Sequence, residues 1–348
     1  MSKSIEKEIG QLIIAGFREN KINKNSDIFK YINKYNIAGV ILYDEDLEIG
    51  GAGSRNITSK SQLKKLSKDL QNISKKSLFI SADQEGGKVH RLKSDYGYLG
   101  TPSWKQIGLL DNELMTKEFS ENLSNELFNA GINLNFAPVL DLDYGDGTVI
   151  SDSKRAFTHN PETLIKHARI FIESHKNRGI ITSGKHFPGI GTGRTDTHEG
   201  FTDLTSSWSV RDLQPFNELI KSNDLDMIMI SHAFDKKLDP LFPASLSKKT
   251  IQGMLRDDLG FKGVVICDDP SMRAISNHYS LKETFKLMIN AGVDLFCLGN
   301  NLIYDKNYIP KSISVISELV DDGEINIEKI YQSIGRINTL KKAYKLNV

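Results

Sequence analysis

The chain has 348 residues, of which 39% are hydrophobic, enough for one barrel-sized domain or two average ones. Its 45 basic and 44 acidic residues leave a net charge of +1, so no overall field attracts nucleic acid or an anionic membrane. No run approaches the roughly 18 apolar residues of a membrane span, and acidic residues interrupt the N-terminal stretch where a signal peptide would be apolar. We therefore expect a cytoplasmic monomer that binds neither nucleic acid nor membrane.

Neither the cysteines nor the glycines form a metal or cofactor motif. Cys267 and Cys297 each lie in an apolar run without metal-ligand spacing, so we expect free thiols in a reducing compartment, and a disulfide between them stays open. The stretch from Gly189 to Gly193 lacks the GxxxxGK[ST] pattern of a phosphate-binding loop. We expect no metal and no cofactor.

Eight short apolar runs recur along the chain and predict buried strands. They lie at residues 12–17, 38–43, 78–82, 134–138, 180–183, 227–230, 264–267 and 294–298. Helical periodicity separates them, at 26–35, 59–75, 112–130, 161–177, 210–222, 244–258, 279–291, 309–321 and 327–345. In the second of these segments Ser59 is a suitable N-cap, and Leu63, Leu66 and Leu70 fall on one face.

Strict alternation of strand and helix predicts an α/β protein with parallel strands joined by helical crossovers. Eight such units over this length favour a single (β/α)8 barrel domain comprising residues 1–348. A doubly wound open sheet is the alternative. It usually has a glycine fingerprint after its first strand, which the residues around Gly16 do not form.

The segment from Gly184 to His198 is unusually polar for the end of a buried strand. It begins with two basic side chains, Lys185 and His186, and continues through a glycine-rich loop to Asp196 and His198. With this spacing the carboxylate of Asp196 can accept the Nδ1 proton of the imidazole and leave Nε2 free to exchange a proton. A solvated loop is the alternative, but the combination favours a polar-ligand site with a movable acid/base.

In a barrel, the side chains that follow the strands meet at one face. Polar residues follow five of the predicted strands: Asp83 to Arg91, then Asp141, Asp143 and Arg155, then Lys185 and His186, then Ser231 and His232, then Asp268 and Asp269. We assign Asp83, Arg91, Arg155, Lys185, His186 and Asp268 to one ligand site. Salt bridges at the barrel rim explain Asp141, Asp143 and Asp269 equally well.

Carboxylates and hydrogen-bonding cations without a metal cluster suit a ligand rich in hydroxyl groups, such as a sugar. Retaining glycoside hydrolysis needs a nucleophile on one side of the anomeric carbon and a proton donor near the leaving oxygen. Asp268, at a strand end, suits the first role, and His198, on a loop, suits the second. Trp104 and Trp208 are candidates for stacking on sugars, although core packing is the commoner role of such residues.

Four separated motifs resemble those of glycoside hydrolase family 3, in particular its single-domain β-N-acetylglucosaminidase branch. They are DQEGGKVHR at 83–91, KHFPG at 185–189, DTH at 196–198 and VICDDPSM at 265–272. The resemblance extends from about residue 10 to residue 340 and implies a (β/α)8 barrel, a retaining double-displacement mechanism and no cofactor. It also implies terminal β-linked N-acetylglucosamine as substrate, with peptidoglycan fragments as its source.

The same resemblance implies a role for each site residue. Asp268 is the nucleophile, and His198 is the general acid/base, polarised by Asp196. The sugar hydroxyls are held by Asp83, Arg91, Arg155, Lys185 and His186. The branch usually reads KHFPGHGDT, whereas Ile190 and Thr192 replace its second His and its Asp here, which leaves loop motion and substrate preference open.

Three alternative functions stay open at this point. A neutral histidine as acid/base leaves room for phosphate in place of water, which would make the chain a β-glycoside phosphorylase. The others are a β-glucosidase of the same family and a sugar-binding barrel without turnover.

Overall fold

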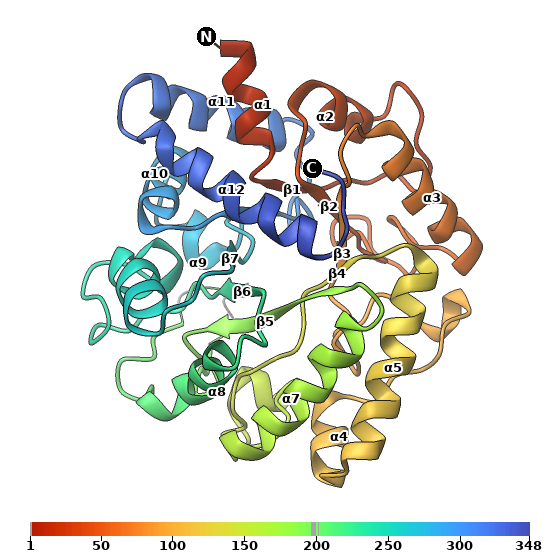
Figure 1. Cartoon of the computed structure of the whole chain (residues 1–348), viewed down its shortest axis with the longest axis vertical. Helices are drawn as coiled ribbons and strands as arrows, with labels where there is room; N and C mark the ends of the chain where they lie inside the picture. The colour runs from red at the N-terminus through yellow and green to blue at the C-terminus, as the bar shows by residue number, and fades with distance from the viewer. Residues whose placement is uncertain (1, 196–199, 201) are drawn as a thin grey trace.

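The computed structural model describes residues 2–195, 200 and 202–348. Eight parallel strands pair in chain order and close into a barrel, with β8 beside β1. Helices surround the strands as a ring, so the predicted (β/α)8 barrel is confirmed (Figure 1). The strands are β1 Ile13–Gly16, β2 Gly39–Ile41, β3 Phe79–Ala82, β4 Leu134–Asn135, β5 Ile181–Phe187, β6 Met227–Ile230, β7 Val264–Cys267 and β8 Leu295–Leu298.

Most helices lie where the periodicity predicts them. These are α2 Asp27–Tyr35, α3 Lys60–Ile73, α5 Glu113–Ala130, α7 Pro161–Lys176, α8 Val210–Lys221, α10 Leu281–Ala291, α11 Tyr308–Asp321 and α12 Ile327–Ala343. Within the part of the chain that the structure describes, no helix has both the length and the apolar character that crossing a membrane requires.

Several short elements were not predicted. They are α1 Ser2–Gly10, the 3-10 turn η1 Ser94–Tyr96, α4 Trp104–Leu110, α6 Val149–Asp152 and α9 Arg273–Ser276. The start of α4 has a signal in the sequence, because Ser103 and Gln106 form a capping box.

The single helix predicted at 244–258 is divided in the structure. Two elements replace it, the 3-10 turn η2 Ala244–Leu246 and the π-helix η3 Lys249–Asp258. Ser247 between them has an extended backbone, and its hydroxyl accepts a hydrogen bond from the backbone N–H of Thr250. The serine therefore ends one element and begins the next.

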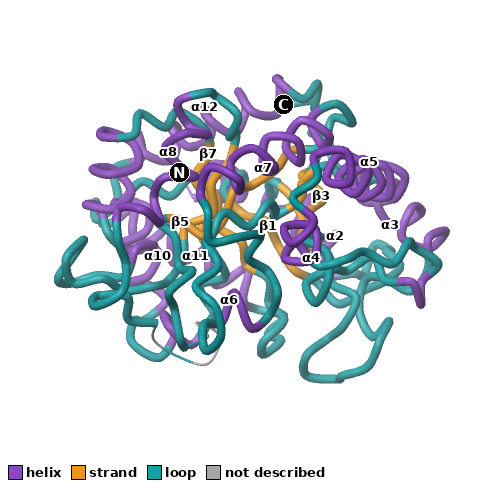
Figure 2. Tube along the Cα trace, turned by 90° about the horizontal axis from the view of Figure 1, so that it is seen from below, coloured by secondary structure: helices purple, strands orange, loops and turns teal. Residues whose placement is uncertain are grey.

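Apolar side chains fill the barrel interior, among them Ile14, Phe79, Phe136, Met229 and Ile266. Ile337 and Leu340 of α12 pack against the same cluster. Figure 2 shows α12 on one side of the molecule and the long loops gathered on the other. One end of the barrel is thus closed by a helix, and the opposite end is left for loops and polar side chains.

Candidate active site

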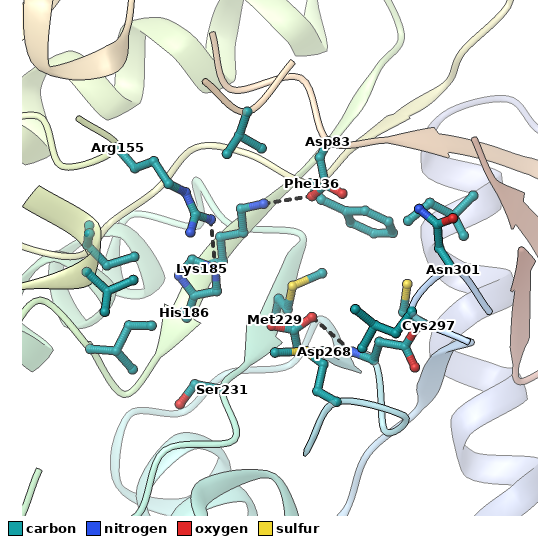
Figure 3. A pocket seen from close by; sticks show the side chains of 18 of the residues that line it. Asp83, Phe136, Arg155, Lys185, His186, Met229, Ser231, Asp268, Cys297 and Asn301 are labelled. Carbon is teal, nitrogen blue, oxygen red and sulfur yellow. Dashed lines mark hydrogen bonds and ion pairs between the residues drawn. The ribbon is translucent and has the colours of Figure 1, made fainter. Parts of the chain in front are cut away.

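The polar side chains that follow the strands meet around one cavity of about 230 Å³ (Figure 3). Six of the predicted site residues lie in the described part of the chain, and all six line this cavity: Asp83, Arg91, Arg155, Lys185, His186 and Asp268. Phe136, Met229 and Cys297 from the barrel interior contribute an apolar surface. Asp196 and His198 lie outside the described residues.

Glu85 joins two cations on the cavity wall, the buried Lys185 and the partly buried Arg155. Its carboxylate accepts two hydrogen bonds from Arg155, each 2.8 Å long, and lies 2.6 Å from Lys185 Nζ. Lys185 Nζ is also 2.8 Å from Asp83 Oδ1. Burial opposes the charge on Glu85, but Arg155 and Lys185 outweigh it and hold the pKa of this carboxyl well below its ordinary value. Glu85 was not among the predicted site residues, although it lies two residues after Asp83 in the same motif.

The end of β5 brings two neighbouring side chains into the cavity. Successive side chains of a regular strand point to opposite faces. Here the pairing with β6 shifts between Lys185 and Phe187, which is the irregularity of a bulge. Lys185 and His186 both line the cavity as a result. The strand continues through these polar residues, past its predicted end at 183.

His186 has a defined tautomer. Its Nε2 lies 3.2 Å from Arg155 Nη2, which can only donate, so Nε2 is the acceptor. Its Nδ1 donates to Asp141 Oδ2 at 2.6 Å. Asp141 also accepts a hydrogen bond from the backbone N–H of Ile190, 2.8 Å away. Asp141 therefore orients the imidazole, whereas Asp143 forms a salt bridge with Lys105, as the rim interpretation predicted.

Arg91 is the cation of the cavity wall with the loosest contacts. Its guanidinium nitrogens lie 3.6 Å from Asp83 Oδ2 and 3.8 Å from Asp44 Oδ1. Its Nε has no hydrogen-bond partner among the described residues. The ring of Tyr43 lies 5.4 Å from the guanidinium carbon. Arg91 therefore keeps donors available for a ligand, while Arg155 and Lys185 are held by carboxylates.

Asp268 faces the cavity from the end of β7. Its Oδ1 accepts a hydrogen bond of 2.9 Å from the backbone N–H of Asp269, and no described cation forms a salt bridge with it. Asp269 is buried and accepts hydrogen bonds from the backbone N–H groups of Ser271 and Gly299. Its carbonyl accepts a third, from His232 Nε2. These contacts fix the segment that holds Asp268, and burial raises the pKa of Asp269 to about 6.

Neither tryptophan lines the cavity. Trp104 is buried, its ring lies 4.5 Å from that of Phe157 at an interplanar angle of 54°, and its ring N–H donates to Val139 O. Trp208 donates its ring N–H to Pro188 O. Trp104 therefore serves packing, the commoner of the two roles considered for it.

Cys267 and Cys297 are both free and buried. Across residues 2–195, 200 and 202–348, no group of three or more His, Cys, Asp or Glu side chains is placed to hold a metal ion.

The Glycosyl hydrolase family 3 N terminal domain matches residues 4–340. The chain belongs to this family. The resemblance seen in the four motifs is thereby confirmed, and the chain is a glycoside hydrolase.

Two β-hexosaminidases are similar to the chain in sequence, and a solved family 3 structure is similar to it in fold. The chain is 36% identical over 276 residues to a β-hexosaminidase of Psychromonas ingrahamii, covering 76% of each chain. It is 35% identical over 274 residues to a β-hexosaminidase of Hydrogenovibrio crunogenus, covering 76% of this chain and 72% of that one. A β-N-acetylglucosaminidase of family 3 from Paenibacillus sp. is similar in structure, with a TM-score of 0.87 and 30% identity over 97% of this chain. The chain spans 62% of that protein's length.

Proposed function

We propose that the protein removes terminal β-linked N-acetylglucosamine from glycosides, with retention of the anomeric configuration. The position of Asp268 supports this most directly, because its carboxylate lines the same cavity as five hydrogen-bonding side chains. No cation of the described chain forms a salt bridge with Asp268, so its carboxylate oxygen is available to attack an anomeric carbon. The relatives named β-hexosaminidase support an N-acetylhexosamine in the cavity. We further propose peptidoglycan fragments in the cytoplasm as the source of the substrate.

The proposed reaction proceeds in two displacements. An oxygen of Asp268 bonds to C1 of the sugar while the bond from C1 to the leaving oxygen breaks, and His198 gives that oxygen a proton. Water then loses a proton to His198 and attacks C1, which releases Asp268 and a sugar of unchanged configuration. Asp196 polarises the imidazole in both steps. The roles of His198 and Asp196 rest on the sequence motif and the family.

The remaining wall binds the sugar hydroxyl groups in this proposal. Asp83 accepts hydrogen bonds, and Lys185 and Arg155 donate them from positions that carboxylates already fix. Donors held in place before binding need little reorganisation. Arg91, with its loose contacts, moves to complete the set.

A panel of aryl β-glycosides tests the substrate and the nucleophile together. The N-acetylglucosaminide is expected to be hydrolysed faster than the glucoside and the xyloside, and sugar 1-phosphate formed in phosphate buffer would instead identify a phosphorylase.

Asp268→Gly should lower kcat by roughly 1,000-fold or more and produce the α-glycosyl azide when azide replaces the missing carboxylate. His198→Gly should produce the β-azide, because azide then attacks the glycosyl-enzyme intermediate. Unchanged rates in both variants would refute the assignment.

A further inference from the structure

The segment at residues 44–54, which follows β2, forms a wall of the active-site cavity. Glu45 and Leu47 of this segment line the cavity together with Asn301 and Leu302, which follow β8. Leu47 is 57% exposed, whereas Asp83 and Lys185 lie deeper in the same cavity. Glu45 and Leu47 therefore belong to its outer rim. An enzyme that removes a terminal sugar buries that sugar and leaves the leaving group toward such a rim.

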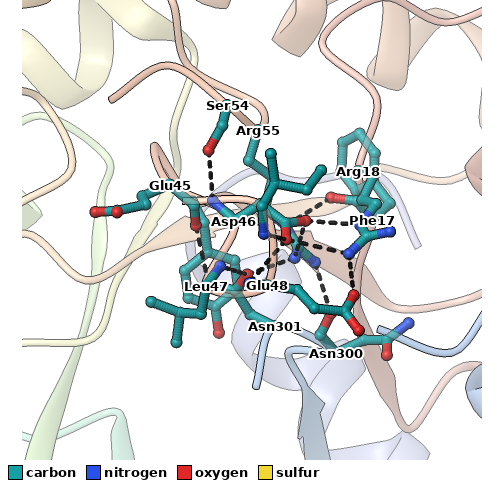
Figure 4. Close-up of polar contacts among 12 residues, drawn as sticks. Phe17, Arg18, Glu45, Asp46, Leu47, Glu48, Ser54, Arg55, Asn300 and Asn301 are labelled. Carbon is teal, nitrogen blue, oxygen red and sulfur yellow. Dashed lines mark hydrogen bonds and ion pairs between the residues drawn. The ribbon is translucent and has the colours of Figure 1, made fainter. Parts of the chain in front are cut away.

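A buried carboxylate fixes this wall to the barrel (Figure 4). Asp46 is fully buried, and its Oδ2 accepts hydrogen bonds from Arg18 Nε at 2.6 Å and from Arg55 Nη1 at 3.3 Å. Its Oδ1 accepts from the backbone N–H groups of Glu48 and Ile49, each 3.1 Å away. The segment thus folds around Asp46 as a compact turn.

Arg55 extends the attachment to the first and last strands. It is 1% exposed, and its nitrogens donate to the carbonyl oxygens of Phe17, Gly299 and Asn300 and to the side chain of Asn301. A buried guanidinium is tolerated when its N–H groups have acceptors, and these acceptors lie at the ends of β1 and β8. The position of the wall is therefore set by the barrel itself.

The charged side chains around Asp46 pair with one another, whereas that of Glu45 does not pair with a described cation. Arg18 and Arg55 offset Asp46 and Glu48. Glu45 accepts a hydrogen bond from the backbone N–H of Gly51 at 3.1 Å, and no cation of the described chain pairs with it. Figure 4 shows its side chain pointing away from the cluster. The rim thus presents a carboxylate without a counter-charge beside the apolar surface of Leu47.

We propose that Glu45 and Leu47 determine leaving-group specificity and favour a leaving group that combines an apolar face with a cationic group. This inference rests on the proposed function, because it concerns the leaving group of the same reaction. The carboxylate attracts an ammonium and repels a carboxylate at the same position, and Leu47 supplies contact area for a ring.

The test compares N-acetylglucosaminides of 4-(aminomethyl)phenol, 4-(hydroxymethyl)phenol and 4-hydroxybenzoic acid at low salt. Glu45→Gln keeps an acceptor for the N–H of Gly51 and removes only the charge. It should lower kcat/KM for the cationic substrate relative to the neutral one by about 2- to 5-fold, the size expected for a rim ion pair. It should also raise the relative kcat/KM of the anionic substrate, and high salt should erase both effects.

Glu48→Gln is the matched control, because it makes the same charge change on the same segment outside the cavity. It should leave both ratios unchanged. The inference is overturned if Glu45→Gln leaves the ratios unaltered, or if Glu48→Gln alters them equally. Failure to hydrolyse any member of the panel would instead refute the proposed function, and the inference with it.

Discussion

Glu85 is the residue on which the charge balance of the cavity wall depends. It contacts Lys185 and Arg155 at 2.6 and 2.8 Å and is 3% exposed. Removing one member of a buried ionic group leaves the others without compensation, and that cost exceeds the net value of the pair. Its removal should therefore lower the stability of the folded protein.

Glu85→Gln is expected to lower the free energy of unfolding by about 3–5 kcal/mol, because Arg155 loses the one described carboxylate that pairs with it and Lys185 keeps only Asp83. Urea denaturation at neutral pH measures this. Asp69→Asn is the control: it breaks the exposed pair with Lys65, 2.6 Å long, and should cost less than about 1 kcal/mol. Similar losses in the two variants would contradict the role given to Glu85.

The sequence predicted the residues of the site better than their partners. Asp83, Lys185 and Asp268 were found because residues after parallel strands converge on one face, which needs no knowledge of side-chain contacts. Glu85 and Glu45 were missed because their roles depend on residues far away in the chain. The long separation between Glu85 and Arg155 leaves no local pattern to read.

The ends of β4 and β5 are the elements that hold the imidazole of His186. Asp141, in the segment after β4, is fully buried and accepts from the His186 ring and from the N–H of Ile190. One carboxylate thereby links two strand ends and the start of the following loop. Because the bulge in β5 depends on pairing with β6, the sequence alone indicated a loop at these residues.

Asp141→Asn should misplace this imidazole. The amide has one acceptor oxygen, so either the His186 ring or the N–H of Ile190 loses its partner, at a cost of about 1–3 kcal/mol. We expect kcat/KM to fall roughly 10- to 100-fold, since small displacements in an active site have effects of this size. Asp143→Asn removes the charge that pairs with Lys105 and keeps an acceptor for the N–H of Gly145, so it should leave the rate close to that of the unaltered enzyme. Equal losses in both variants would argue against the orienting role.

At the scale of the whole molecule the two ends of the barrel differ in chemistry. The loops at one end hold the cavity, and α12 closes the other through Ile337 and Leu340. Lys341, beside them, is 5% exposed and donates to the carbonyl oxygens of Ala38 and Ser77 at 3.2 and 2.7 Å. Its ammonium lies 4.7 Å from the centre of the Phe79 ring. The closed end thus contains a cation that no carboxylate of the described chain neutralises.

This cation should make stability depend on pH. Burial lowers the pKa of Lys341 from its ordinary 10.5 to about 7. Above pH 7 the unfolded chain keeps a proton that the folded protein has lost, so the free energy of unfolding should rise with pH, by at most about 1.4 kcal/mol per unit. Below pH 7 both states are protonated, so Lys341 no longer makes the free energy of unfolding depend on pH. Urea denaturation between pH 7 and pH 9 should show the slope in the unaltered protein and in Lys342→Met, whose exposed side chain is the control. In Lys341→Met the slope should be lost, and parallel curves for all three proteins would show that the buried amine does not titrate with folding.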